Sequence, residues 1–162
     1  MRRRNKVKHK IDIVCDDLKY LPTYANDSDL CMDVKVKAPK NGYVLTPNST
    51  HIFCTGIKVK VPYGWGLEIV PRSSTGIKMR CRLANSKAVI DAGYRDEIML
   101  AIHNFGNQTQ IIEDGQRICQ LKLVEKHEIE WNIVPDDENF REGNRGGGIG
   151  STNVDSLGNR KL

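Results

Sequence analysis

The sequence has few features of a membrane, secreted or disulfide-rich protein. It has no run of about 18 apolar residues, so no segment is expected to span a membrane. Its start, MRRRNKVKHK, is basic but lacks the apolar stretch of a secretion signal. The five cysteines are an odd number without a C-x-x-C spacing, so neither structural zinc nor a disulfide framework is expected. A soluble cytoplasmic protein is the prediction.

Basic charge is concentrated at the N-terminus. The whole chain of 162 residues has a formal net charge of +5. Residues 1–10 hold six Lys or Arg and no acid, which leaves −1 on the other 152 residues. A basic arm on a nearly neutral body does not indicate a nucleic-acid-binding domain, and no nucleic acid partner is expected.

Apolar residues recur at the spacing of β-strands, and no long window has helical spacing. Turn sequences such as PKNGY, PYGWG, NFGNQ and EDGQ separate the short apolar segments. Strands are therefore expected at residues 7–13, 57–61, 67–69, 98–105, 116–124 and 127–134. This pattern predicts an all-β barrel or sandwich over residues 1–135, followed by a flexible, glycine-rich tail over residues 136–162.

Several short polar motifs follow or interrupt these strands. PRSSTGIK places Arg72 and two serines before a helical turn expected around residues 75–80, an arrangement that suits phosphate but also an ordinary capped turn. Gln120 lies where a loop enters a strand, and Asp33 lies inside an apolar stretch. Each of these signals is weak alone.

The stretch AVIDAGYRDEIM carries more chemistry. AVI is expected to enter a hairpin, DAGY to turn it, and EIMLAIH to return as the second strand. Asp91 at the mouth of this hairpin is a candidate general base toward water, and the ring of Tyr94 is a candidate surface for a sugar. An ordinary turn beside an aromatic residue is the alternative.

Five stretches occur in the order LCMDV, PRSSTG, AVIDAGYRDE, GQRICQL and RGGGIGST. Together they resemble the five-motif signature of the trimeric dUTPases, over residues 6–152. The resemblance implies a distorted β jelly-roll, a homotrimer that shares its active sites between subunits, and Mg2+ as cofactor. It implies hydrolysis of dUTP to dUMP and pyrophosphate, which keeps uracil out of DNA and supplies dUMP for dTMP synthesis.

The resemblance also implies a role for each matching residue. Asp91 would activate the water that attacks the α-phosphorus, and Tyr94 would exclude a ribose 2′-OH. Asp33 would reach the metal through water. The base contacts would come from Asn85, Ala88 and Met99, the phosphate contacts from Arg72, Ser73, Ser74 and Gln120, and the tail contacts from Arg145, Ile149, Gly150, Ser151 and Thr152. Ile149 stands where the family motif has an aromatic residue.

Three other functions are alternatives. The dCTP deaminases and bifunctional deaminase–dUTPases are similar, but they need a Glu ten residues after the Asp, and here that position is Ala101. A dUTPase homologue that binds a regulatory protein partner is the second alternative. A purely structural jelly-roll subunit is the third, and the set of Arg72, Ser73, Asp91, Tyr94 and Gln120 argues against it.

Overall fold

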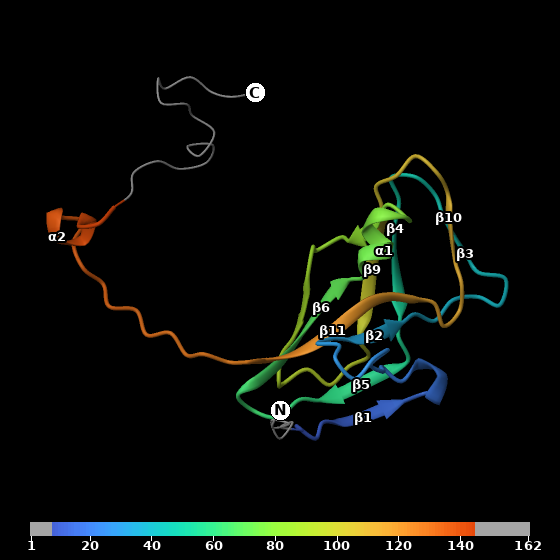
Figure 1. Ribbon diagram of the computed structural model, residues 1–162, viewed down its shortest axis with the longest axis horizontal. Coiled ribbons are helices and arrows are strands. Elements are labelled where there is room, and N and C mark those ends of the chain that lie inside the picture. The colour runs from blue at the N-terminus through green and yellow to red at the C-terminus, as the bar shows by residue number, and fades with distance from the viewer. Residues whose placement is uncertain (1–7, 145–162) are drawn as a thin grey trace. The chain divides into compact units, whose positions relative to one another are not determined.

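A computed structural model describes residues 8–144, in two units that divide after His127. The first unit is almost entirely β-structure (Figure 1). Its strands are β1 (Asp12–Cys15), β2 (Met32–Lys35), β3 (Tyr43–Leu45), β4 (Thr50–Cys54), β5 (Ile57–Lys60), β6 (Trp65–Pro71), β7 (Cys81–Leu83), β8 (Ala88–Ile90), β9 (Met99–Asn104), β10 (Gln110–Ile112) and β11 (Arg117–Glu125). A short 3-10 turn, η1 (Leu18–Tyr20), and one helix, α1 (Ser73–Ile77), interrupt them.

The strands form two larger sheets and two strand pairs. One sheet has the order β2-β11-β6-β8 and the other β4-β9-β7, and the pairs are β1-β5 and β10-β3. Every ladder is antiparallel. Buried side chains from both larger sheets meet in one apolar core, which includes Phe53, Ile69 and Ile102. The expectation of an all-β jelly-roll is therefore confirmed.

The alternation of residue types explains most strands. In β5, Ile57 and Val59 are buried while Lys58 and Lys60 are exposed, as period-two geometry requires. Asn104 ends β9 as a buried polar residue. Its amide nitrogen donates to the carbonyls of Leu45 (3.0 Å) and Gln108 (2.8 Å), which fixes the turn that follows.

Three local predictions need correction. The strand expected over residues 7–13 begins only at Asp12, and the helical turn expected at residues 75–80 begins at Ser73. AVI and EIMLAIH do not pair, because β8 is bonded to β6 while β9 is bonded to β4 and β7. The hairpin is instead β7 with β9, and residues 84–98 form the excursion between them.

The second unit is described over residues 128–144. The strand expected at residues 127–134 is absent, because that segment has no backbone ladder with another described residue. A short helix, α2 (Glu138–Arg141), follows. It begins at Asp137, whose carboxylate accepts from the backbone N–H of Phe140 at 3.0 Å. The domain boundary predicted at residue 135 stays a prediction. No helix among residues 8–144 is long and apolar enough to cross a membrane.

Candidate active site

The first group of predicted site residues lies around Asp33. Antiparallel pairing of β2 with β11 places Asp33 directly opposite Gln120, which on its other side faces Val70 of β6. Arg72 follows the end of β6, and its Nε lies 2.9 Å from one Asp33 oxygen. The other oxygen is 3.1 Å from a guanidinium nitrogen of Arg117. One buried carboxylate therefore holds two cations at the end of this sheet.

Helix α1 begins beside this group. The backbone N–H of Arg72 donates to the carbonyl of Ile118 at 3.0 Å, and the hydroxyl of buried Thr75 donates to the same oxygen at 2.6 Å. These two bonds fix the first turn of α1 against β11. Ser73 is exposed and Ser74 is half-buried. Their amides lie in the first turn, where a helix has no internal acceptor for its N–H groups.

The second group lies at the turn from Asp91 to Tyr94. The turn is closed by the N–H of Tyr94, which donates to the Asp91 carbonyl at 3.0 Å. The Tyr94 hydroxyl donates to the Glu97 carbonyl at 2.7 Å, so the half-buried ring is fixed at both ends. A guanidinium nitrogen of Arg95 donates to the carbonyls of Ala92 (2.6 Å) and Tyr94 (2.8 Å). The tight turn predicted for DAGY is confirmed.

The base-binding residues predicted around this turn flank the β7–β9 hairpin. The last ladder contact is the N–H of Ala84 donating to the Ala101 carbonyl at 2.8 Å. Asn85 follows immediately and is exposed, and Met99 begins β9 on the opposite side. Ala88 is farther along the excursion, where it pairs with Ile69 of β6. Backbone groups beyond the end of the β7–β9 ladder are therefore near Asn85 and Met99.

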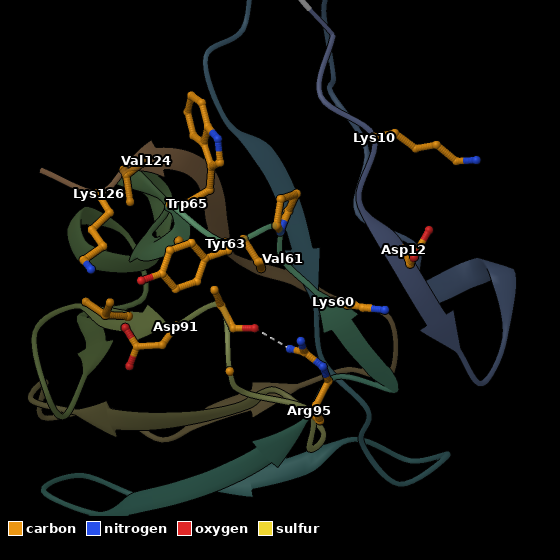
Figure 2. A pocket seen from close by; sticks show the side chains of 16 residues that line it. Lys10, Asp12, Lys60, Val61, Tyr63, Trp65, Asp91, Arg95, Val124 and Lys126 are labelled. Carbon is orange, nitrogen blue, oxygen red and sulfur yellow. Dashed lines mark hydrogen bonds between the residues drawn. The ribbon is translucent and has the colours of Figure 1, made fainter.

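A pocket of about 930 Å³ adjoins Asp91. Figure 2 shows Asp91 beside Tyr63, with Trp65 beyond Tyr63 and Arg95 at the lower side of the pocket. Its cations and acids are Lys10, Lys60, Arg95, Lys126, Asp12 and Asp91. The pocket thus combines aromatic surface with an excess of positive charge, which is a suitable environment for an anionic ligand.

The two groups lie at different places on one chain. Leu67 pairs with Ile90, so Asp91 follows β8 at the level of Gly66. Arg72 follows the other end of β6, six residues after Gly66, which corresponds to roughly 20 Å at about 3.3 Å per residue. Within one subunit, Asp91 and Arg72 are therefore too far apart to contact the same triphosphate.

An ion cluster lies between these two groups. Glu68 of β6 is 2.6 Å from the Lys87 ammonium and 3.1 Å from that of Lys122. Hydrogen bonds and Coulomb attraction from these two lysines lower the pKa of the Glu68 carboxyl. The cluster occupies the sheet surface between the two groups, and its carboxylate is already neutralised.

The described residues offer no metal cage. No group of three or more His, Cys, Asp or Glu converges among residues 8–144. Both oxygens of Asp33 already contact guanidinium groups. The donor set therefore suits only an ion that brings most of its ligands with it, as Mg2+ does with phosphate oxygens and water.

Some predicted residues lie outside the described part, and some residues beside the two groups are not among the predicted ones. Arg145, Ile149, Gly150, Ser151 and Thr152 all lie outside residues 8–144. Arg117 was missed because it lies three positions before Gln120, which strand alternation assigns to the opposite face. A register shift between Arg117 and Cys119 changes that relationship. Arg95 and Tyr63 were also missed, although an Arg after a predicted active-site turn is a usable signal.

The fold is all-β, and it carries two groups of predicted site residues, one with two guanidiniums around a buried carboxylate and one with a carboxylate at a tight turn, as expected of the class of nucleotide hydrolases. The model of the dUTPase family matches residues 19–152. A deoxyuridine 5′-triphosphate nucleotidohydrolase of Ehrlichia canis (strain Jake) is 31% identical over 156 residues, which cover 91% of this chain and 100% of that protein. The chain belongs to the dUTPase family.

Two further comparisons agree. A deoxyuridine 5′-triphosphate nucleotidohydrolase of Rickettsia akari (strain Hartford) is 35% identical over 135 residues, covering 83% of this chain and 88% of that protein. A mutant dUTPase from phage phi11 of S. aureus, described with a structural Mg(II) ion, has a TM-score of 0.67 and 18% identity. The match covers 80% of this chain and 99% of the phage chain, and at that identity it supports the fold alone.

Proposed function

We propose that this chain hydrolyses dUTP to dUMP and pyrophosphate, with Asp91 as the general base. The proposal rests on one observation: a chain of the dUTPase family contains both the Asp33–Arg72–Gln120 group and the Asp91–Tyr94 turn. The first group offers cations and amides to phosphates. The second offers a carboxylate that lines a pocket, and an aromatic ring whose hydroxyl is held by the Glu97 carbonyl.

The chemistry assigned to the residues follows from what they present. The Asp91 carboxylate accepts a proton from the water that attacks the α-phosphorus, a contribution typically worth about 10²–10⁴-fold. Arg72 and the amides of Ser73 and Ser74 bind the phosphate oxygens, and Gln120 helps position them. The Tyr94 ring limits the space beside the sugar. Asn85, Ala88 and Met99 supply backbone or amide groups to uracil.

Magnesium is proposed as the cofactor, held mainly by the triphosphate oxygens and water. When bound, Mg2+ would neutralise phosphate charge and fix the conformation of the triphosphate. Asp33 would meet the water shell of the ion. For this it must share oxygens that now contact Arg72 and Arg117.

A homotrimer with shared sites is the proposed assembly. Its support is the separation of roughly 20 Å between Asp91 and Arg72 along β6. A second copy must bring its own Arg72 group to the Asp91 pocket for both to act on one substrate. Residues 145–152 of a further copy are proposed to complete the site. A cytoplasmic location stays a prediction.

The decisive experiment is product analysis with dUTP, dCTP, dTTP and UTP, with and without Mg2+. Mg2+-dependent release of pyrophosphate from dUTP alone is expected. Conversion of dCTP to a uracil nucleotide would instead indicate the deaminase alternative. No turnover of any of the four would contradict the proposal and direct attention to a regulatory protein partner.

A further inference from the structure

A segment outside the family match borders the catalytic pocket. Residues 8–11 precede β1 and are exposed or half-buried, and the match to the family begins only at residue 19. The ring centroid of His9 lies 4.3 Å from that of Trp65, with the planes tilted by 48°. Trp65 lines the Asp91 pocket, as do Lys10 and Asp12 from the segment itself. Figure 2 shows Lys10 and Asp12 across the pocket from Tyr63 and Asp91.

We propose that residues 8–12 form a wall of the active-site pocket and that Lys10 increases the affinity of the pocket for the anionic substrate. This inference rests on the proposed function. His9 is the positioning residue, because its ring contact with Trp65 holds the segment before the β1–β5 ladder begins at Asp12. Exposed chain ends otherwise fray unless something ties them down.

The role falls to Lys10 because two other cations of the pocket, Arg95 and Lys126, have partners within the protein. Lys60 has no side-chain partner among the described residues either, but it belongs to β5 and not to the segment that precedes β1. Arg95 donates to two carbonyls of the Asp91–Tyr94 turn. The Lys126 ammonium lies 5.5 Å from the Tyr63 ring centroid. Among residues 8–144, Lys10 makes no hydrogen bond or ion pair, so its charge is available to a ligand. A cleft lined by one sign of charge raises the local concentration of a ligand of opposite charge.

The test compares Lys10→Gln and Lys10→Glu with the same changes at Lys40. Lys40 is an exposed residue between β2 and β3 that does not line the pocket. At about 0.05 M salt, we expect Lys10→Gln to lower kcat/KM for dUTP about threefold and Lys10→Glu about tenfold, with kcat unchanged. At about 0.5 M salt the differences should fall below about twofold, because screening shortens the range of the charge. The Lys40 variants should match the wild type throughout.

The positioning role of the His9–Trp65 ring contact is tested separately. His9→Ala should reproduce the loss seen for Lys10→Gln, whereas His9→Phe keeps a ring on Trp65 and should retain wild-type kcat/KM. Thermal melting excludes a global loss of stability. Equal kcat/KM for the Lys10 and Lys40 variants at both salt concentrations would overturn the inference while wild-type dUTP hydrolysis still stands. An inactive wild type would instead remove the proposed function on which the inference rests.

Discussion

Complementation between two inactive variants should reveal how the site is assembled. Asp91→Asn removes the proposed base from one end of β6, and Arg72→Gln removes the phosphate-binding cation from the other. The two positions are roughly 20 Å apart in one chain. Each variant alone should have at most about one hundredth of wild-type kcat, because loss of a general base costs at least about 10²-fold and loss of a group that stabilises transition-state charge costs about 10²–10³-fold.

The magnitude in a mixed oligomer follows from symmetry. In a cyclic trimer that pairs Asp91 of each subunit with Arg72 of the next, every mixed trimer has one intact site of three, whichever variant is in excess. Co-expressed chains with two different tags, purified through both tags, should therefore show about one third of wild-type kcat per trimer. A symmetric dimer would give about one half.

Steady-state pyrophosphate release from dUTP is the assay, with light scattering to fix the mass of the purified species. Asp91→Asn mixed with the Asp91→Asn, Arg72→Gln double variant is the control, since neither chain has an intact base, and it should stay inactive. If the doubly purified mixture of single variants is no more active than its parents, both residues act within one chain. The separation of Asp91 and Arg72 along β6 would then be no argument for a site shared between subunits.

Three further outcomes are expected. Tyr94→Ala should raise the ratio of kcat/KM for UTP over dUTP, and Tyr94→Phe, which keeps the ring, should leave that ratio near wild type. Hydrogen bonds from Lys19 and Tyr20 lower the pKa of Asp114 to about 2. Its stabilisation is therefore complete above the unfolded pKa near 4 and is lost as the pH falls through 2. Asp114→Asn should cost about 1–2 kcal/mol at pH 7 and only a small fraction of that at pH 2 in urea unfolding. Truncation after Asn144 should lower kcat/KM strongly, and Ile149→Phe should leave it equal or raise it by up to about tenfold, because base stacking on an aromatic ring contributes roughly 1–3 kcal/mol.

Local patterning predicted the strands but not their partners. Alternation or short apolar runs identify β5, β6, β9 and β11, because a sheet with one buried face imposes period two. AVI was recognised as a strand, yet its partner is β6, about twenty residues earlier, and not the segment that follows it. The choice between near and distant partners depends on the packing of the whole sheet, which residue types in one window do not encode.

At residues 127–134 the sequence predicts a strand that the structure does not contain. Its alternating Ile129, Trp131 and Ile133 satisfy the strand pattern, but all three side chains are exposed. A segment with alternating apolar residues forms a β-strand only when a neighbouring strand supplies backbone hydrogen bonds. Within the described residues no such neighbour is present, so the sequence signal was real and its interpretation as a paired strand was wrong.

The sequence predicted which residues belong to the candidate site, but only some of the contacts between them. Asp33, Arg72 and Gln120 were predicted from separate motifs, and the β2-β11-β6 ladder brings them together. The second cation on Asp33 comes from Arg117 through a register shift, which local sequence does not signal. A β-bulge depends on how a strand pairs with its neighbours, so it can be identified only in the assembled sheet.

Both groups of predicted site residues carry an excess of positive charge. Around Asp33, two guanidiniums face one carboxylate, which leaves one uncompensated positive charge beside the amides of α1. Around Asp91, four cations line the pocket with two carboxylates, again an excess of positive charge. Two separated positive groups repel when subunits bring them together, and a polyphosphate between them reverses the sign of that interaction. Substrate binding should therefore strengthen the contact between subunits of the proposed trimer. The oligomer should dissociate less readily when a non-hydrolysable dUTP analogue is bound, and by linkage a weakened interface should raise KM.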